Sequence, residues 1–177
     1  MLVRTLFASM LLVSTAVAAD VTVVGNTVVL NGAIERGDAV KIAPLLAENA
    51  TLKLTSNGGS FFEAVEIAKL VFASNASTVA SAQCDFECAY VWLAGSTKYI
   101  DPLAPTAPVI APPNAEGAIG SDLPTMAMVG WLISQYDLPV GVSYRFGFLG
   151  QGSTKSLTLT AEFMVSEFKM PVSDWVE

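Results

Sequence analysis

Short β-branched runs alternate with segments of helical periodicity along the first half of the chain. Residues 21–30, 51–55 and 78–81 have the composition of strands, and a segment with apolar residues at helical spacing follows each of them. Gly25-Asn26 in the middle of the first run predicts a hairpin. Because two parallel strands of one sheet need a crossover between them, the alternation predicts an α/β domain with a mostly parallel sheet flanked by helices.

Polar residues mark where the predicted helices begin. Asp38 is the expected N-cap of the first helix. Ser60 and Glu63 form a capping-box pattern, S-x-x-E, which predicts the start of a second helix that runs through Phe72. A third helix is expected after the paired cysteines and runs through Leu93.

The second half of the chain interrupts this pattern. Residues 101–124 contain six of the nine prolines, interleaved with Ala and Gly, and each proline removes a donor from a strand ladder. We therefore expect this Pro-rich segment to be a surface loop or an excursion at the edge of the sheet. Beyond it the pattern predicts a helix over 125–136, a strand over 142–148, and a final helix after 157–160 with Thr160 as its cap.

The first nineteen residues have the three-part layout of a secretory signal peptide. Arg4 supplies the positive start, residues 6–17 are almost wholly apolar, and small residues at 16–19 suit a signal peptidase. A membrane anchor is the weaker alternative, because about a dozen apolar residues fall short of the roughly 20 that a spanning helix needs. The sequence therefore predicts a leader over 1–19 and a single exported domain over 20–177, periplasmic or extracellular, with no membrane contact after cleavage.

The predicted mature chain is acidic. Nine Lys and Arg stand against sixteen Asp and Glu, and loss of Arg4 with the leader leaves eight against sixteen, a net charge of −8. Nucleic acid and anionic membrane surfaces need a basic stripe to bind to, so this charge argues against both as partners. The residues around the motifs do not indicate a nucleotide site, and we expect no cofactor.

Cys84 and Cys88 are the two cysteines of the chain. In an oxidising compartment a pair this close in sequence usually forms a disulfide. So short a loop gains less chain entropy than a longer one, and we expect the bond mainly to fix a local turn. A zinc site is the competing interpretation. It fails on ligand count, because two thiolates in a chain without histidine do not complete the usual ligand shell. We therefore predict a disulfide and no metal.

Four motifs then occur in a characteristic order. They are Leu30-Asn31-Gly32-Ala33-Ile34, Leu54-Thr55-Ser56-Asn57-Gly58-Gly59, Cys84-Asp85-Phe86-Glu87-Cys88-Ala89 and Leu157-Thr158-Leu159-Thr160-Ala161-Glu162. In this order the chain resembles the Clp protease/crotonase superfamily, and specifically its exported branch. The S-x-G-G turn and the paired cysteines at a strand-to-helix junction are the most specific pieces. The resemblance implies a single Clp protease/crotonase-like domain with repeated ββα-type units.

In that superfamily the two middle motifs carry the protease chemistry. A backbone N–H of the Gly-Gly turn, here Gly58 or Gly59, forms part of the oxyanion hole that stabilises the negative oxygen of the intermediate. The nucleophilic serine lies between the cysteines, and the N–H of the next residue, here Glu87, completes the hole. The resemblance places Phe86 at the serine position, and a benzyl side chain has no nucleophilic atom. The histidine position falls within 109–112, yet the chain contains no histidine.

Other polar residues near these motifs have simpler explanations than catalysis. A relocated serine nucleophile is disfavoured, because Ser60 is expected to cap a helix while Ser81 and Ser96 lie at a strand end and in a turn. Asp85 and Glu87 are two carboxylates on one turn. They are expected to complement the first turn of the following helix, and a paired-carboxylate acid/base site is the alternative.

The predicted function is that of an exported, non-catalytic Clp-protease-like protein, a pseudo-serine protease. Such a protein acts in binding a peptide or another protein, or in assembly as a homo-oligomer. The alternative is a divergent hydrolase or acyl-transfer enzyme that uses the retained oxyanion-type turn with Glu87 or Asp85. The leading hypothesis predicts no hydrolytic activity and no labelling by a serine-directed fluorophosphonate.

Overall fold

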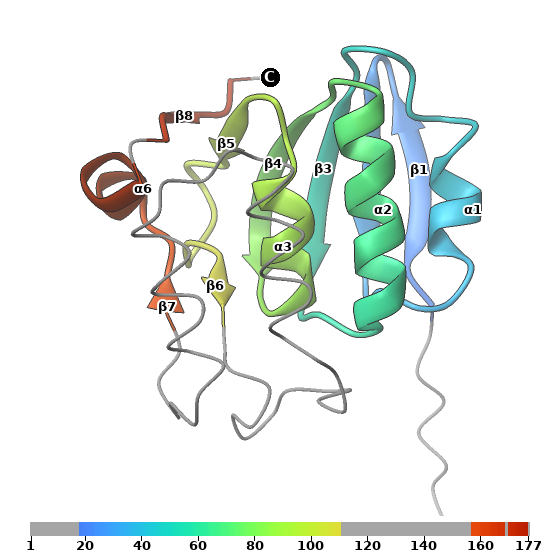
Figure 1. Ribbon diagram of the computed structural model, residues 1–177, viewed down its shortest axis with the longest axis horizontal. Coiled ribbons are helices and arrows are strands. Elements are labelled where there is room, and N and C mark those ends of the chain that lie inside the picture. Colours follow the sequence, from blue (N-terminus) through green and yellow to red (C-terminus); the bar gives the residue numbers. More distant parts are fainter. Residues whose placement is uncertain (1–17, 111–156, 169, 177) are drawn as a thin grey trace, which may run out of the picture.

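The computed structural model describes residues 18–110, 157–168 and 170–176. One six-stranded sheet dominates it and contains, in spatial order, β1 (Asp20–Val24), β2 (Thr27–Asn31), β3 (Thr51–Ser56), β4 (Ser77–Cys84), β5 (Lys98–Ile100) and β8 (Val172–Asp174) (Figure 1). β1 is antiparallel to β2, and every later pair of neighbours is parallel. The predicted α/β class with a mostly parallel sheet is confirmed.

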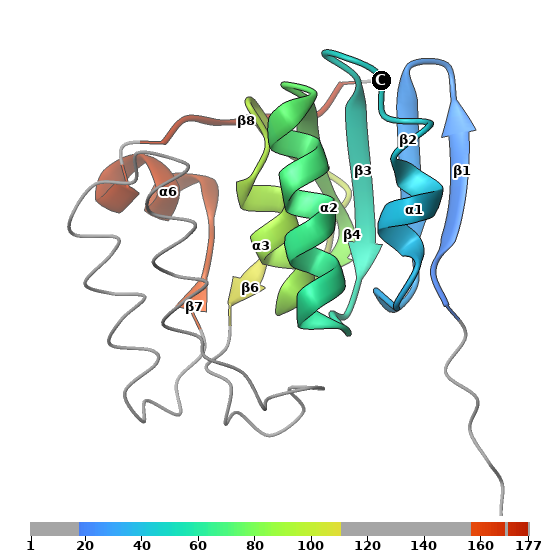
Figure 2. The same cartoon turned by 45° about the vertical axis from the view of Figure 1, so that its right-hand side comes forward.

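Three helices lie in front of the sheet in both views. They are α1 (Asp38–Ile42), α2 (Phe61–Ala73) and α3 (Glu87–Leu93) (Figures 1 and 2). At the end of the sheet formed by β5 and β8 lie α6 (Ala161–Phe168) and a small antiparallel sheet of β6 (Val109–Ile110) and β7 (Leu157–Thr158). None of the described helices is long and apolar enough to span a membrane.

The core lies between the sheet and the three helices, and period-two alternation along the strands explains it. Leu30 of β2 and Leu54 of β3 are fully buried, whereas their neighbours along each strand are exposed or only partly buried. From the helices, Ile67 and Trp92 are fully buried. Each such side chain contributes about 1.5–3 kcal/mol when it leaves water. The Trp92 indole N–H donates to the carbonyl oxygen of Tyr99 at 2.9 Å, so the polar edge of this ring is satisfied.

Three local predictions agree with the structure. Gly25-Asn26 joins β1 to β2 in an antiparallel hairpin. The Ser60 hydroxyl accepts a hydrogen bond from the Glu63 N–H at 3.4 Å, which caps α2. Thr160 caps α6 in the same way, at 3.1 Å.

Two capping interactions differ from the prediction. α1 begins at Asp38 itself, and its N-cap is Gly37, which makes no side-chain capping bond. The Asp38 carboxylate instead accepts from the Glu35 N–H at 2.8 Å. The carboxylate of Glu63 does not return to its own helix start, because it accepts from the Ala39 N–H at 2.6 Å. Tertiary contact between α1 and α2 thus replaces half of the predicted capping box.

The strands also depart from the prediction in places. β4 extends beyond 78–81 through a bulge at Ala82, where φ is 51°. β5 and β8 have no counterpart in the prediction, because three residues carry too little pattern. Residues 101–110 form a loop that ends in β6, outside the central sheet. The predicted leader up to residue 17, the rest of the Pro-rich segment and the elements at 125–136 and 142–148 lie outside the described residues.

The carboxyl ends of β3 and β4 lie side by side. Ser56 at the end of β3 pairs with Cys84 at the end of β4. The turns that follow these two strands therefore meet at one edge of the sheet, with the starts of α2 and α3 beside them (Figure 1). Open parallel sheets bind ligands at this edge, which makes the two turns the candidate site.

Candidate functional site

The first part of the site is the glycine turn, residues 56–59. Gly58 and Gly59 have φ values of 99° and 141°, which residues with side chains rarely adopt. The Gly58 N–H donates to the Ser56 hydroxyl at 3.1 Å. A side chain at Gly59 would overlap the backbone of Ile34, which pairs with Gly59 in a bridge beside the sheet. The path of the chain thus requires both glycines.

The second part is the elbow, residues 84–88, at the junction of β4 and α3. Phe86 has φ 52° and ψ −116°, an unfavourable backbone conformation for a residue with a side chain. Two hydrogen bonds hold it there. The Asp85 N–H donates to the Ser56 carbonyl oxygen at 3.0 Å, and the Phe86 N–H donates to the Val109 carbonyl oxygen at 2.7 Å. A strained strand-to-helix turn of this kind is where hydrolases present their nucleophile.

Cys84 and Cys88 are paired as a disulfide across the elbow, with their Cα atoms 5.1 Å apart. Both side chains are buried. The bond joins the last residue of β4 to α3 and encloses Phe86, so it restrains the elbow itself. Within the part of the chain that the structure describes, no three metal-binding side chains lie together, and the zinc interpretation gains no support there.

The Phe86 side chain lies beside the glycine turn. A Cβ on Gly58 would be 3.1 Å from the Phe86 Cβ and 3.4 Å from its Cδ2. Phe86 is half-buried, so part of it remains accessible. At the position where the resemblance expects a serine, the elbow presents an apolar surface.

The Glu87 side chain reaches back to the glycine turn. Its Oε2 accepts a hydrogen bond from the Gly59 N–H at 3.0 Å, and Glu87 is only 9% exposed. Burial raises the pKa of this carboxyl, while hydrogen bonds from the N–H groups of Gly59 and of Glu87 itself oppose the rise. Burial also raises the pKa of the Tyr90 phenol, and the charge of Glu87 adds to that effect. The Gly59 N–H, one of the groups that the resemblance assigns to an oxyanion hole, thus donates to a carboxylate of the protein's own.

Asp85 and Glu87 have different partners. The Asp85 carboxylate accepts from the Gln83 side-chain amide at 2.6 Å in an exposed position. Glu87 is buried and points to Gly59. The two carboxylates differ in exposure and in bonding, and this arrangement gives a paired acid/base site no support.

The serines that were alternatives as nucleophiles also have partners. Ser60 caps α2. Ser81 donates to the Asp101 carboxylate at 2.9 Å, and Asp101 also pairs with Lys53 at 3.4 Å. Ser96 donates to a backbone carbonyl oxygen of the loop before β4 at 2.9 Å. Each of the three hydroxyl groups thus makes a hydrogen bond that gives it a structural role, and no catalytic role is needed to account for it.

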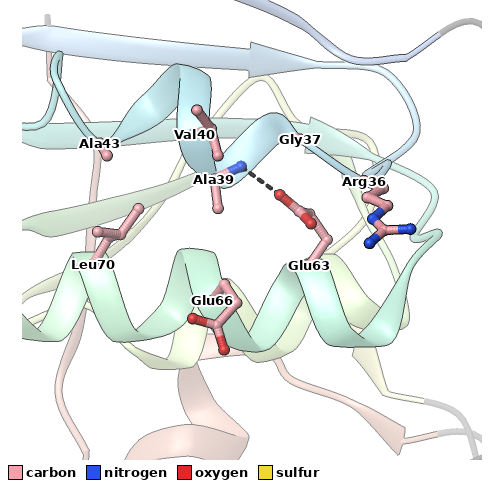
Figure 3. A pocket seen from close by; sticks show the side chains of 8 residues that line it. All are labelled: Arg36, Gly37, Ala39, Val40, Ala43, Glu63, Glu66 and Leu70. Carbon is pink, nitrogen blue, oxygen red and sulfur yellow. Dashed lines mark hydrogen bonds between the residues drawn. The ribbon is translucent and has the colours of Figure 1, made fainter.

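A groove of about 430 Å³ lies between α1 and α2 (Figure 3). Its lining consists of Arg36, Gly37, Ala39, Val40, Ala43, Glu63, Glu66 and Leu70. The Glu63 carboxylate points from α2 toward α1, where it meets the Ala39 N–H (Figure 3). No residue of the glycine turn or the elbow lines this groove, so it is separate from the candidate site.

Two interactions that shape the site have no counterpart in the sequence-based predictions. The sequence marks Val109 only as one of the residues where the histidine is expected, yet its carbonyl oxygen accepts the hydrogen bond from the Phe86 N–H that holds the elbow. The Glu87 side chain is predicted to complement the helix start or to form half of an acidic pair, yet it accepts a hydrogen bond from the Gly59 N–H. The partners are 23 and 28 residues apart, and neither contact has a local sequence signal.

Comparisons with known proteins bear on the fold. No family model and no curated protein matches the sequence. Among solved structures, ClpP1 from Listeria monocytogenes matches with a TM-score of 0.60 at 13% identity, over 86% of this chain and 92% of that chain. A point mutant of the same ClpP1 matches with a TM-score of 0.57 at 12% identity over the same shares. The chain has the Clp protease/crotonase-like fold that its motifs predict.

Proposed function

We propose that this chain is an exported, non-catalytic Clp-protease-like protein that binds a peptide or another protein at the glycine turn and elbow. Phe86 is the observation that carries the proposal. A side chain without a nucleophilic atom stands on the strained elbow between the paired cysteines and lies against Gly58. The chain has no histidine that would activate a nucleophile elsewhere.

The same geometry supports binding. A turn without side chains lets the backbone of a ligand approach closely, and Phe86 adds an apolar surface beside it. Backbone donors next to an apolar contact are the means by which proteins bind extended peptides. Export agrees with the Cys84–Cys88 pair, since disulfides persist in oxidising compartments.

Reaction with a fluorescent fluorophosphonate tests the absence of catalysis. Wild-type protein and Phe86→Ser are incubated with the probe, with an active serine protease in a parallel tube. We expect neither protein to be labelled, because a serine without a general base stays a weak nucleophile. Labelling of the wild type at a serine whose replacement abolishes the signal would refute the proposal.

Fluorescence anisotropy tests binding. The probe is a neutral heptapeptide of Ala, Leu and Ser, blocked at both ends and labelled with fluorescein. We expect Phe86→Ala to weaken its binding about fivefold or more, because a well-packed apolar contact is lost. The matched control is Phe72→Ala, which removes an exposed ring at the far end of α2 and leaves binding unchanged. No binding by the wild type between about pH 4.5 and pH 7.5 overturns the proposed role.

A further inference from the structure

We propose that Glu87 is an internal occupant of the peptide site. Its carboxylate takes the place of a peptide main-chain carbonyl oxygen on the Gly59 N–H, and a peptide binds only after Glu87 is protonated or displaced. This inference rests on the proposed function, and it names the group that the ligand offers and the way in which its access is controlled.

The glycine turn offers one donor for such a contact. The Gly58 N–H is taken by the Ser56 hydroxyl at 3.1 Å, whereas the Gly59 N–H points to Glu87 Oε2 at 3.0 Å. A Cβ on Gly58 would lie 2.5 Å from that oxygen and 3.1 Å from the Phe86 Cβ. The space left by the missing side chain is therefore filled by the carboxylate oxygen, between the turn and the phenyl ring.

The Gly59 N–H holds the Glu87 carboxylate, and the charged groups around it are engaged elsewhere. On its own helix the buried Tyr90 phenol is the titratable group that feels its charge. β4 and β6 contribute no titratable side chain apart from the disulfide-bonded Cys84. The charged groups of the elbow, α2 and β3 have these partners: Asp85 with Gln83, Glu63 with the Ala39 N–H, Glu66 with Lys69, and Lys53 with Asp101.

Protonation weakens this internal contact. A carboxylate accepts a charge-assisted hydrogen bond, which is roughly twice as strong as the neutral bond that a carboxylic acid accepts. Burial raises the pKa of the Glu87 carboxyl, so its proton binds at a higher pH than in an exposed glutamate. Falling pH therefore weakens the hold of Glu87 on the Gly59 N–H, and a peptide carbonyl oxygen displaces it more readily. A neutral carbonyl suits the site better than an anion, because the chain has a net charge of −7.

NMR spectra of ¹⁵N-labelled protein test the contact without any ligand. In the wild type we expect the Gly59 amide proton to shift upfield as the pH falls from about 7.5 to 4.5, because its charged acceptor is neutralised. Glu87→Gln abolishes this titration. The control Glu66→Gln, which removes an exposed acid of α2, keeps it. A Gly59 amide that does not titrate, or that titrates equally in Glu87→Gln, overturns the inference.

The blocked heptapeptide tests the consequence for binding. We expect the wild type to bind it about tenfold more tightly at pH 4.5 than at pH 7.5, because the peptide displaces a neutral carboxylic acid at the lower pH and a carboxylate at the higher one. Glu87→Ala binds it at pH 7.5 as tightly as the wild type does at pH 4.5. Circular dichroism at each pH confirms that the proteins remain folded. Equal pH dependence in the wild type and Glu87→Ala overturns the control of access by Glu87.

A second peptide tests which chemical group of the ligand the Gly59 N–H binds. The same heptapeptide with a free C-terminal carboxylate is expected to bind no more tightly than the blocked form. Tighter binding of the free acid overturns the assignment to a main-chain carbonyl. If no variant binds either peptide at any pH, the proposed function and the gating both fail, and the Gly59 titration then reports by itself whether Glu87 contacts the turn.

Discussion

The ammonium group of Lys98 donates a hydrogen bond of 2.6 Å to the carbonyl oxygen of Gly95, and both residues are buried. Lys98 begins β5 just beyond the C-terminal end of α3, where a positive charge is favourable. Burial nevertheless lowers its pKa to about 8, because desolvation disfavours the charged form. Lys98 therefore loses its proton more readily in the folded protein than in the unfolded chain.

This lowered pKa gives stability a defined pH dependence. Between about pH 8 and an unfolded-state pKa of 10.5 the unfolded chain binds more protons, so stability rises with pH over this window. From about pH 7 to about pH 9.5 we expect the free energy of unfolding of the wild type to rise by about 2 kcal/mol relative to Lys98→Met. Urea denaturation of both proteins at the two pH values measures this. An unchanged difference would contradict the lowered pKa.

Two glycines with positive φ are predicted to respond differently to alanine. Gly25 has φ 61° and nothing within 4 Å of an added Cβ, so Gly25→Ala brings backbone strain alone, about 1–2 kcal/mol. At Gly59 an added Cβ also overlaps the backbone of Ile34. We expect Gly59→Ala to lower the free energy of unfolding by about 3 kcal/mol or more. Equal losses in the two variants would mean that the glycine turn relaxes freely.

The sequence predicts β1 to β4 of the sheet and the two turns of the site, and the reasons are local. Alternation along β2 and β3, the Ser60 cap and the adjacent Gly58 and Gly59 are all short-range signals. Together with the motif order, these signals predict the fold that the chain shares with ClpP1. Local propensity and packing agree in these segments, so the pattern alone is sufficient there.

What the sequence does not predict depends on contacts between distant segments. Glu63 fits a capping box by spacing, but the Ser60 N–H donates to the Ile34 carbonyl oxygen and the Glu63 carboxylate accepts from the Ala39 N–H of α1 instead. Glu87 fits a helix start equally well, and only the folded chain brings Gly59 within 3.0 Å of it. β5 is a strand of three residues whose first residue is a buried lysine, and no strand pattern predicts that.

Reduction of the Cys84–Cys88 disulfide is expected to lower the free energy of unfolding. The loop that it closes is short, and the chain-entropy model gives about 2 kcal/mol for it. Urea denaturation with and without a phosphine reductant measures this effect and leaves both buried side chains in place. Cys84→Ala combined with Cys88→Ala should cost more, because it also leaves a cavity. A reduced protein as stable as the oxidised one would contradict the restraint that we assign to the elbow.

Assembly as a homo-oligomer is a further prediction, and α2 offers a place to test it. Phe62 is 66% exposed and Phe72 is 48% exposed on this helix. We expect size-exclusion chromatography with light scattering to give a defined multiple of the mass of one chain. Phe62→Glu should reduce that mass, because an interface does not readily bury an unpaired charge. Its free energy of unfolding should stay within about 0.5 kcal/mol of the wild type, as for exposed substitutions. A monomeric wild type would contradict assembly.

The first described residues bear on where the predicted leader ends. Ala19 is 3% exposed, and its Cα would lie 3.3 Å from a Cβ added to Gly32. Its carbonyl oxygen accepts a hydrogen bond from the Lys41 ammonium at 3.4 Å. A chain processed between Ala18 and Ala19 loses the bridge of Ala18 to Ala33 but keeps this packing and this hydrogen bond, whereas a chain that starts at Asp20 loses all three. If the chain is exported as proposed, we expect Ala19 to be the first residue of the mature protein, one residue before the domain boundary of 20 predicted from the sequence.

Intact-mass spectrometry of the protein from an envelope fraction measures the cleavage position. Ala16-Val17-Ala18 provides the small residues that a signal peptidase needs, so Ala18→Leu is expected to block cleavage before Ala19. A mature chain that starts at Asp20 would contradict the position but not the export. An unprocessed chain that stays with the cytosol would contradict the export itself, and it would place the Cys84–Cys88 pair in a reducing compartment where such a bond rarely persists.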